Sequence, residues 1–348
     1  MTLAPLKIVL TAAGCPGAAA LIRMLRTNGE RDVTIVGTDV RAEAAGRLLC
    51  DGFETVPPGA SSEYVGVLAS VVERERPDVL FVQSSAEVGP VSRARAVFER
   101  LGTRALVASP AAIDLCNDKA AMYAALARRP VPQPETLEPG DLDEFVAACE
   151  RLGYPDRPVC FKPPVSKGSR GFRILRPDVD RAGIVLHERP NSVVMTLDEA
   201  VAAFRDLIPF PRLLVMEFVE APEYTVDALA AGGELLLYQT KTREAINTGL
   251  AMSFRTVDRP DLVASAREAG RALGLDWFVN LQFKGDKLLE VNPRVSTFVY
   301  QEDFILPYLG IKYALGELEG QDLAAAQARV RTSRRTLRYH EQLFWDER

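Results

Sequence analysis

The chain has 348 residues, of which 47% are hydrophobic and 26% charged, and its formal net charge is −5. This composition is typical of a folded globular protein and excludes wholesale disorder. One hydrophobic core stops growing at roughly 250–300 residues, so the length predicts more than one domain. An acidic chain lacks the overall basic charge that phosphate binding favours, which argues against a nucleic-acid partner.

Histidine and cysteine usage narrows the kinds of site that the chain can hold. The only histidines are His187 and His340, too few for a histidine-rich metal site. The five cysteines are odd in number and include no C-x-x-C spacing, a pattern typical of reduced thiols in the cytosol. No apolar run approaches the roughly 18 residues that span a bilayer, and the N-terminus lacks the features of a signal peptide. We therefore expect a cytoplasmic protein with no membrane partner.

The first third of the sequence alternates short apolar runs with helical spacing. The apolar runs expected to form strands are 7–11, 33–37, 78–82 and 105–108. The segments with helical spacing are 18–26, 62–75 and 90–101. Strands separated by helices predict βαβ units and a parallel sheet, with ligands near the carboxyl ends of the strands.

A glycine-containing turn, Thr11–Gly17, joins the first expected strand to its helix. With Asp39 downstream it could bind a dinucleotide, but Pro16 and Gly17 depart from the G-x-G-x-x-G spacing. A structural tight turn, or a site for a substrate carboxylate at the helix N-terminus, is favoured over NAD binding.

The middle of the chain changes character. Ser109-Pro110 and Asn117-Asp118-Lys119 are helix starts, because each combines a capping side chain with a good first residue. The proline-rich segment 130–139 predicts a linker and an edge strand. Further elements are expected as a helix at 142–152, strands at 159–162 and 172–175, and a long exposed excursion at 176–193.

The last part predicts an α+β arrangement with an antiparallel sheet. Helices are expected at 197–207 and 262–273, and strands at 213–218, 224–230, 234–240, 278–283 and 287–291. Gly232-Gly233 and Lys284–Lys287 are typical hairpin turns.

Two segments carry residues suited to nucleotide chemistry. Lys162 ends a strand and precedes the flexible loop Ser166–Gly171, and a lysine beside a loop of free backbone N–H groups can grip phosphates. Downstream, a tight turn brings Gln282 near Glu290, and Asn292 lies on the same face as Glu290 because the two are two residues apart. Three oxygen ligands of this kind suit Mg²⁺, with nucleotide phosphates and water completing the octahedron.

Three further features complete this group. Arg294 extends from the same strand toward an anionic intermediate. Backbone groups at Glu217 and Val219 could pair with an adenine edge, and Glu223 could accept hydrogen bonds from ribose hydroxyls.

In this order, the motifs N-D-K, F-K-P, S-K-G-S-R-G, M-E-F-V-E, E-Y-T-V-D and Q-F…L-E-V-N-P-R resemble the ATP-grasp superfamily. The resemblance is closest to the branch of the carbamoyl-phosphate synthetase large subunit and biotin carboxylase, and it runs over nearly the whole chain. It implies an α/β and α+β fold, in which a pre-ATP-grasp domain with a Rossmann-like parallel sheet precedes a two-lobe ATP-grasp unit. The implied divisions are 1–113 for the first domain, 114–212 and 213–330 for the two lobes, and 331–348 for a C-terminal tail.

The resemblance also implies site residues. ATP would be bound by Lys119, Lys162, Ser166, Lys167, Gly168, Ser169, Gly171, Glu217, Phe218, Val219 and Glu223. Mg²⁺, with Mn²⁺ as an alternative, would be held by Gln282, Glu290 and Asn292. Arg294 and Lys162 would be the catalytic residues, with Arg294 stabilising an acyl phosphate or its attack.

The implied activity is an ADP-forming ligase that joins a small-molecule or amino-acid carboxylate to an amine through an acyl phosphate. A kinase that releases a phosphorylated product, a non-catalytic ATP-binding regulator and, more distantly, a Rossmann dehydrogenase are the alternatives. Asn247-Thr-Gly249 departs from the family's histidine before Thr-Gly, and no glutaminase or biotin-attachment segment is present. Glu87 could serve the domain interface or an amine, and Lys241 and Arg243 could face phosphates or an anionic substrate. The basic run Arg331–Arg338 is expected to be a solvated tail, a helix face or a homodimer contact.

Overall fold

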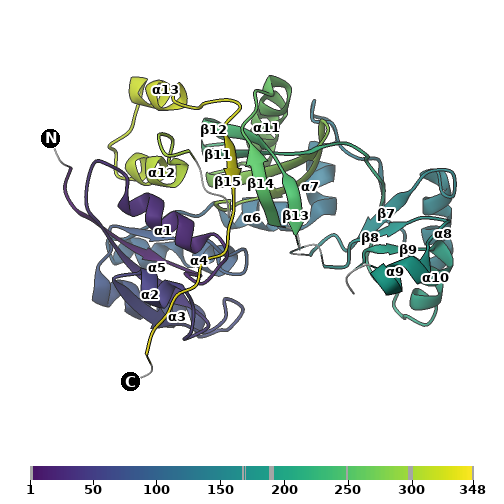
Figure 1. Cartoon of the computed structure of the whole chain (residues 1–348), viewed down its shortest axis with the longest axis horizontal. Coiled ribbons are helices and arrows are strands. Elements are labelled where there is room, and N and C mark those ends of the chain that lie inside the picture. The colour runs from purple at the N-terminus through teal and green to yellow at the C-terminus, as the bar shows by residue number, and fades with distance from the viewer. Residues whose placement is uncertain are drawn as a thin grey trace.

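The computed structural model describes residues 3–166, 168, 170–187, 192–247, 250–296 and 301–346. The first domain and the second lobe lie against each other, and the lobe that contains β7–β9 projects to one side (Figure 1). Within the described ranges no helix combines the length and the apolar character that crossing a bilayer requires.

The first domain is built on a five-stranded parallel sheet of order β3-β2-β1-β4-β5. Its strands are β1 (Leu6–Leu10), β2 (Val33–Asp39), β3 (Gly52–Thr55), β4 (Val79–Phe81) and β5 (Arg104–Ala105). Its helices are α1 (Ala18–Arg26), α2 (Gly46–Leu49), α3 (Tyr64–Glu75), α4 (Val88–Arg93) and α5 (Arg95–Arg100). The order reverses between β1 and β4, so the crevice at their carboxyl ends is where ligands bind in such sheets.

The alternation of apolar runs and helices therefore predicts the parallel sheet correctly, with three differences in detail. The single helix expected at 90–101 is two helices, because Ala94 leaves the helical conformation. The strand expected at 105–108 is the two-residue β5. The sequence analysis missed α2 and β3, since β3 has only one large apolar residue, Phe53.

Two helices lead from this domain to the first lobe. In α6 (Pro110–Asn117) the Ser109 hydroxyl accepts from the N–H of Ala112 at 3.2 Å. In α7 (Lys119–Leu126) the Asp118 carboxylate caps the first turn. Both helix starts were expected, because these side chains satisfy N–H groups that a helix cannot satisfy itself.

The first lobe is a five-stranded sheet of order β6-β10-β7-β8-β9, covered by helices that pack on a cluster of phenylalanines. Its strands are β6 (Thr136–Leu137), β7 (Val159–Lys162), β8 (Arg173–Leu175), β9 (Val194–Met195) and β10 (Leu214–Glu217), and its main helices are α8 (Leu142–Arg151) and α10 (Leu197–Phe204). β6 is an edge strand, as expected, but β8 and β9 run parallel. The excursion expected at 176–193 contains a short helix, α9 (Arg181–His187), with no buried residue.

The second lobe carries the longest strands, in an antiparallel sheet of order β12-β11-β15-β16. They are β11 (Glu223–Ala231), β12 (Glu234–Thr242), β15 (Trp277–Lys284) and β16 (Lys287–Asn292), and α11 (Pro260–Leu273) packs on this sheet. Gly285 lies in the tight β15–β16 turn with φ +62°, a conformation that glycine adopts without strain.

A fourth sheet, of three strands, corrects the expectation for part of the C-terminal segment. Its strands are β13 (Glu244–Asn247), β14 (Leu250–Arg255) and β17 (Arg335–Leu337), and the sequence analysis gave bounds for none of the three. β17 lies inside the basic run 331–338, so this part of the run is an edge strand paired with β14 rather than a free tail. Mixed arginine and threonine composition hides such a strand, because its pairing partner lies about eighty residues earlier in the chain.

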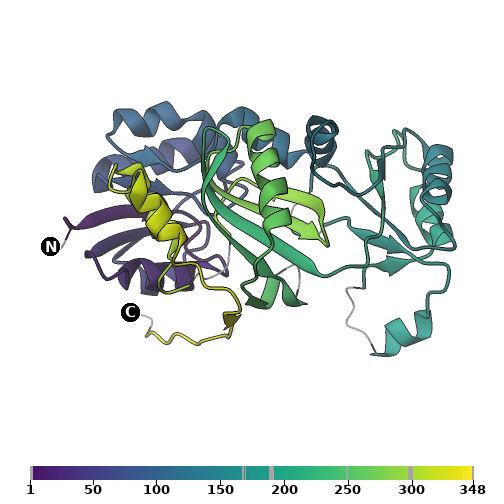
Figure 2. The same ribbon diagram turned by 90° about the horizontal axis from the view of Figure 1, so that it is seen from above.

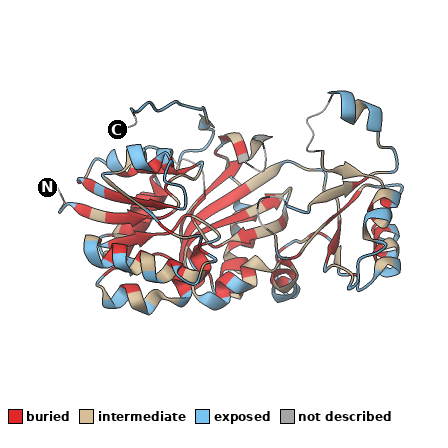
Figure 3. Ribbon diagram, turned by 90° about the horizontal axis from the view of Figure 1, so that it is seen from below, coloured by how far each residue is buried: buried red, intermediate tan, exposed pale blue. Residues whose placement is uncertain are grey.

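Helix α12 (Leu306–Ala314) joins the first domain to the second lobe, and α13 (Gln321–Gln327) follows it. The two parts share one hydrophobic core: Phe81 of β4 contacts Phe278 of β15 at a ring distance of 5.1 Å. Figure 1 and Figure 2 show α12 against α1, and Figure 3 shows buried residues concentrated in the sheets and exposed residues in α9 and the C-terminal segment. The second lobe and the first domain therefore form one packed body.

Candidate active site

The hairpin of β15 and β16 brings the three expected metal ligands together. Its register places Gln282 opposite Glu290 and Asn280 opposite Asn292. The amide nitrogen of Asn292 donates to Glu290 Oε1 over 3.0 Å. One face of the hairpin therefore carries a carboxylate and two side-chain amides within contact distance.

A residue that the sequence analysis missed, Asn280, organises this face. Its Oδ1 accepts hydrogen bonds from Gln282 Nε2 at 3.1 Å and from Asn292 Nδ2 at 3.4 Å. Because the NH₂ group of each amide is turned to Asn280, the carbonyl oxygen of each is turned away from it. Spacing alone could have found Asn280, since it lies two residues before Gln282 and so on the same face of the strand.

The chain of contacts continues into the protein interior. Asn280 Nδ2 donates to Asp227 Oδ1 over 2.6 Å, and the second Asp227 oxygen forms an ion pair with Lys241. Both charged side chains are about 1% exposed. The sequence analysis suggested that Lys241 faces phosphates or an anionic substrate. The structure corrects this, because the Lys241 ammonium is buried in an ion pair with the Asp227 carboxylate.

Glu290 is the only carboxylate of the three ligand candidates, and its surroundings keep it charged. Burial disfavours the carboxylate, but the nearby Lys119, the hydrogen bond from Asn292, and the charges of Lys162 and Arg294 outweigh burial and hold the pKa below its ordinary value. Lys119 Nζ lies 4.0 Å from Glu290 Oε2. A carboxylate that is ionised at neutral pH is what a divalent cation requires.

The two candidate phosphate lysines approach this carboxylate from different elements, Lys119 from the start of α7 and Lys162 from the end of β7. Burial lowers the pKa of Lys162 to about 8, with Lys119 acting in the same direction and Glu290 opposing. Lys119 is 5% exposed and donates to the carbonyl of Ser166 over 3.1 Å. Two ammonium groups thus sit near one carboxylate, an arrangement that an added polyanion would stabilise.

The loop between β7 and β8 lies directly beside these lysines. Gly168 and Gly171 have φ of +62° and +74°, and a Cβ on Gly171 would lie 2.6 Å from Pro163 Cδ. Ser166 Oγ donates to the carbonyl of Pro163 over 3.3 Å. Two of the expected loop residues, Lys167 and Ser169, lie outside the described residues, as do Thr248 and Gly249 of the Asn-Thr-Gly segment.

The expected adenine and ribose contacts lie where β10 leaves its sheet. Glu217 accepts from the N–H of Glu135 at 2.8 Å and forms an ion pair with Lys287, while Lys284 lies over the ring of Phe218 at 4.5 Å. Val219 is partly exposed. These contacts tie the segment between the lobes to the β15–β16 turn.

The last ribose candidate, Glu223, begins β11. It forms a 3.4 Å ion pair with Arg243, a residue that the sequence analysis had offered for phosphates or an anionic substrate. In this arrangement Arg243 neutralises Glu223.

Arg294 reaches from the second lobe to the first domain. Its Nε donates to Ser85 Oγ over 2.7 Å, and Ser85 follows β4 at the reversal of the parallel sheet. Burial raises the pKa of the Cys15 thiol, in the turn after β1, and the charge of Arg294 opposes that rise. Arg294 therefore lies where the metal-ligand candidates and the crevice of the first sheet meet.

Glu87 lies behind this junction rather than on its surface. It is 4% exposed and accepts from the Thr11 hydroxyl over 2.7 Å. Burial raises its pKa to about 7, and the charge of Asp39 adds to the rise. This hydrogen bond links the carboxyl ends of β1 and β4. It therefore favours a structural role for Glu87 over contact with an amine.

The donor set fits a hard divalent cation. It offers one carboxylate and two amide oxygens, all hard ligands, and the described residues contain no cluster of three or more His, Cys, Asp or Glu side chains that could form a cage by themselves. Mg²⁺ is typically bound by one or two protein oxygens together with substrate phosphates. Gln282, Glu290 and Asn292 are the residues of this face that could hold it.

Sequence comparisons find similar proteins. Residues 209–336 match a family model described as "ATP-grasp in the biosynthetic pathway with Ter operon". Carbamoyl phosphate synthase large chains are relatives: that of Acidobacterium capsulatum is 28% identical over 251 residues and that of Archaeoglobus fulgidus 27% over 244. The alignments take in 68% and 66% of this chain but only 20% and 21% of the relatives, so the chain spans about a fifth of their length.

Solved structures show the same fold. The biotin carboxylase domain of Hydrogenobacter thermophilus 2-oxoglutarate carboxylase aligns with a TM-score of 0.66 and 16% identity, over 90% of this chain and 70% of that one. An L-amino acid ligase from Bacillus licheniformis aligns with a TM-score of 0.64 and 15% identity, over 94% and 78%. The resemblance expected from the sequence is confirmed: this chain has the ATP-grasp fold, and it is related in sequence to carbamoyl phosphate synthase large chains.

Proposed function

We propose that the chain is an ATP-dependent, ADP-forming ligase that joins a small-molecule carboxylate to an amine through an acyl phosphate. The observation that carries the proposal is the convergence of Lys119 and Lys162 on Glu290, beside the amides of Gln282 and Asn292. Two cations, one ionised carboxylate and two amide oxygens at one point match the needs of a metal-bound triphosphate. The fold neighbours include ligases, among them the L-amino acid ligase, which supports the reaction class.

The proposed reaction has two balanced steps. The γ-phosphoryl group passes from ATP to a carboxylate oxygen, so that the bond from the γ-phosphorus to the bridging oxygen breaks and ADP leaves. The amine nitrogen then attacks the acyl carbon, the bond to the phosphate oxygen breaks, and inorganic phosphate and a proton are released.

The residues of this chain act mainly by position and charge. Lys119 and Lys162 attract the phosphates and offset charge on the transferring group, and Glu290 with its two amide neighbours fixes the metal beside them. Bound Mg²⁺ would neutralise negative charge on the phosphate oxygens. Arg294 would hold the acceptor carboxylate and then the charge that develops during attack, since a guanidinium matches two carboxylate oxygens.

The lobes would enclose the nucleotide between their sheets. The backbone at Glu217 and Val219 would meet the adenine, Phe218 would flank it, and Glu223 would meet the ribose if its contact with Arg243 is exchanged. The loop with Ser166, Gly168 and Gly171, together with Lys167 and Ser169, would cover the phosphates. The proposed divisions are 1–113, 114–212 and 213–330, with 331–348 following them.

ADP formation by Glu290→Gln tests the proposal. The substitution removes the only charged ligand candidate, and we expect ADP release in the presence of Mg²⁺, ATP and a panel of acids and amines to fall at least about 100-fold. Glu268→Gln, in α11, where the half-buried carboxylate pairs with Arg271, is the matched control and should keep the rate. An unchanged rate in Glu290→Gln, or the absence of Mg-ATP binding by the native chain, would overturn the proposal.

Product analysis distinguishes the alternatives. A ligase yields an amide with ADP and phosphate in equal amounts. A stable phosphorylated product without free phosphate would mean a kinase, and Mg-ATP binding without turnover across the panel would mean a regulatory protein; both outcomes contradict the ligase.

A further inference from the structure

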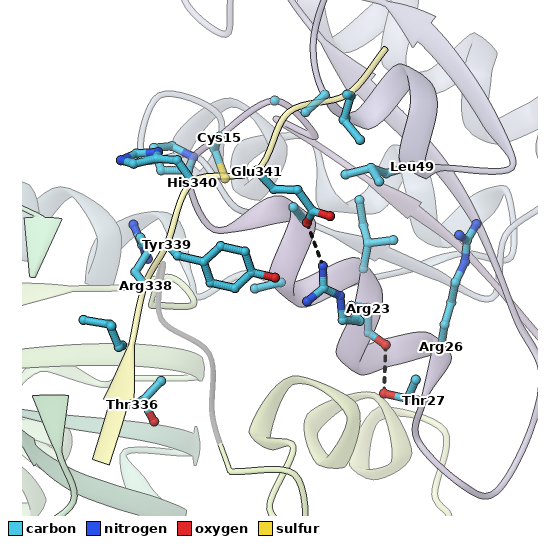
Figure 4. A pocket seen from close by; sticks show the side chains of 18 of the residues that line it. Cys15, Arg23, Arg26, Thr27, Leu49, Thr336, Arg338, Tyr339, His340 and Glu341 are labelled. Atoms are coloured by element: carbon cyan, nitrogen blue, oxygen red, sulfur yellow. Dashed lines mark hydrogen bonds and ion pairs between the residues drawn. The ribbon is translucent and has the colours of Figure 1, made fainter. Parts of the chain in front are cut away.

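A cavity of about 720 Å³ lies between α1 of the first domain and the C-terminal segment 331–343, which we call the strap. It borders the turn after β1 rather than the phosphate lysines, and no lysine or ligand candidate of the proposed nucleotide site lines it. Figure 4 shows α1 on one side, the strap on the other, and Tyr339 projecting from the strap toward α1. A cavity of several hundred cubic ångströms is of the size that binds small molecules.

The strap is fixed at both ends of the cavity. β17 pairs with β14, and the Arg338 N–H donates to the carbonyl of Met252 over 2.8 Å. Farther along, Glu341 forms a 3.3 Å ion pair with Arg23 of α1. The strap thus links the second lobe to the first domain over the cavity.

The body of the cavity is apolar. Small and branched side chains of the first domain face apolar side chains of β14 and the strap; they include Ala20, Ile22, Leu49, Phe254, Leu337 and Leu343. Exposed apolar side chains beside a cavity favour an apolar occupant, because such an occupant removes their surface from water. An apolar ligand body is therefore the first requirement.

Charge at the cavity is predominantly positive. Arg23, Arg26 and Arg338 line it against one carboxylate, Glu341. Arg23 pairs with Glu341, and Arg26 pairs with Asp51 over 2.9 Å. Arg338 adds a guanidinium at the end of the cavity that Cys15 lines. An anionic group on the occupant is the second requirement.

Cys15 lies where the cavity approaches the proposed active site: its thiol donates to the side-chain oxygen of Gln83 over 3.5 Å, and Arg294 donates to Ser85, two residues after Gln83. Burial raises the pKa of its thiol, and the charge of Arg294 opposes that rise. The Cys15 thiol also acts electrostatically on Arg338, whose pKa burial lowers. Cys15 therefore lines the cavity together with Arg338 of the strap, and it contacts the segment after β4 to which Arg294 also bonds.

We propose that this cavity holds the apolar body of the carboxylic acid that the enzyme activates, with the carboxylate beside Cys15, between Arg294 and Arg338. The inference rests on the proposed ligase function and gives its acid a chemical class: an apolar monocarboxylic acid. The strap is then a specificity element, because it supplies Arg338 and one apolar wall.

Protection of Cys15 from alkylation tests the occupant without any nucleotide. The full chain is treated with N-ethylmaleimide with and without octanoate, and modification of each cysteine is followed by peptide mass spectrometry. Octanoate at ten times its dissociation constant should slow labelling of Cys15 about ten-fold by mass action. Cys50 is half-buried and does not line the cavity, so its labelling rate should not change. 1-Octanol, with the same chain and no charge, should protect more weakly.

Four variants test where octanoate binds. Ala20→Trp should abolish protection by filling the cavity. Arg338→Met keeps a long aliphatic stem but removes the charge, so it should remove the preference for octanoate over 1-octanol. Leu343→Asp should weaken octanoate binding more than Leu343→Asn, because only the aspartate adds a repelling charge to a side chain that is 37% exposed. Thermal unfolding shows whether each variant is folded. If Ala20→Trp does not fold, the comparison of Leu343→Asp with Leu343→Asn tests the inference.

The results separate this inference from the proposed function. If octanoate leaves the rate at Cys15 unchanged, protects no better than 1-octanol, or binds Leu343→Asp and Leu343→Asn alike, the inference is overturned. ADP formation, measured separately with other acids, would still support the ligase in that case. Protection of Cys15 in a chain that shows no Mg-ATP turnover would remove the ligase function and, with it, the assignment of the cavity to the activated acid.

Discussion

The side-chain amide of Asn280 donates a 2.6 Å hydrogen bond to the carboxylate of Asp227 beneath the proposed metal site. This bond fixes which way the Asn280 amide faces, so that its oxygen accepts from Gln282 and Asn292. The amide oxygens of those two residues are thereby turned away from Asn280. Asn280 is thus a positioning residue, because it acts on the proposed metal through its neighbours.

Asn280→Leu should impair metal use more than nucleotide binding. The substitution keeps the branched shape of the side chain but removes its acceptor and its donor, so Gln282 and Asn292 lose the contact that orients them. We expect the Mg²⁺ concentration for half-maximal ADP formation to rise about 10- to 100-fold, the usual cost of losing an outer-shell partner. A Mg²⁺ titration at saturating ATP measures it.

The control for this prediction is the dissociation constant of ATP without metal, which should change little. If Asn280→Leu lowers the maximal rate at every Mg²⁺ concentration without moving the midpoint, the residue does not orient the metal ligands.

Glu87 should make stability depend on pH. Its pKa is raised from 4.5 to about 7 in the folded chain, so between these values the folded state keeps a proton that the unfolded state releases. Stability from this group therefore falls as the pH rises through that window, by up to roughly 3 kcal/mol. Glu87→Gln stays neutral, so its free energy of unfolding minus that of the native chain should be larger at pH 8 than at pH 5.

Urea unfolding of both proteins at the two pH values measures this effect. The same difference between Glu87→Gln and the native chain at pH 5 and pH 8 would mean that Glu87 does not hold a proton near neutrality.

Lys162 should take up a proton when ATP binds in alkaline solution. Its pKa is lowered to about 8 by burial, so at pH 9 most of the free protein carries a neutral amine. Phosphates near the amine favour the ammonium form and raise the pKa. Calorimetric titration at pH 9 in two buffers of different ionisation enthalpy should show uptake of most of one proton.

In Lys162→Arg the side chain stays charged at this pH, and the uptake should disappear. Equal proton uptake by Lys162→Arg and the native chain would assign the proton to another group.

Gly171→Ala should weaken nucleotide binding through the loop conformation. With φ of +74° and a Cβ position 2.6 Å from Pro163 Cδ, an alanine forces the loop to move. Strain of this kind costs about 1–3 kcal/mol, which corresponds to roughly a 5- to 150-fold rise in the dissociation constant of Mg-ATP if the loop must keep this shape to bind.

Gly66→Ala is the matched control, because Gly66 lies in α3 with nothing within 4 Å of its Cβ position. It should leave nucleotide affinity unchanged and raise stability by up to about 1 kcal/mol. Native affinity in Gly171→Ala would show that the loop does not contact the phosphates in this conformation.

Sequence patterns could predict much of the fold because the relevant signals are local. Ser109 and Asp118 cap the helices that follow them, and the apolar runs around Ile8 and Ile35 give buried parallel strands. The two-residue spacing of Glu290 and Asn292 predicts a shared face without any knowledge of the rest of the chain. The missed strand β17 has no such signal, because it is stabilised by pairing with β14.

The sequence by itself therefore determined the fold class, the order of the motifs and the identity of the residues on the β15–β16 hairpin. Only the tertiary structure decided that Lys241 is buried against Asp227, that Asn280 orients two amides, and that the strap encloses a cavity against α1. The reason is physical. Periodicity and capping depend on neighbours within a few residues, whereas burial, ion pairing and cavities depend on which segments meet in space. Asp227 and Lys241 meet across the paired strands β11 and β12, and the strap meets α1 from the other end of the chain.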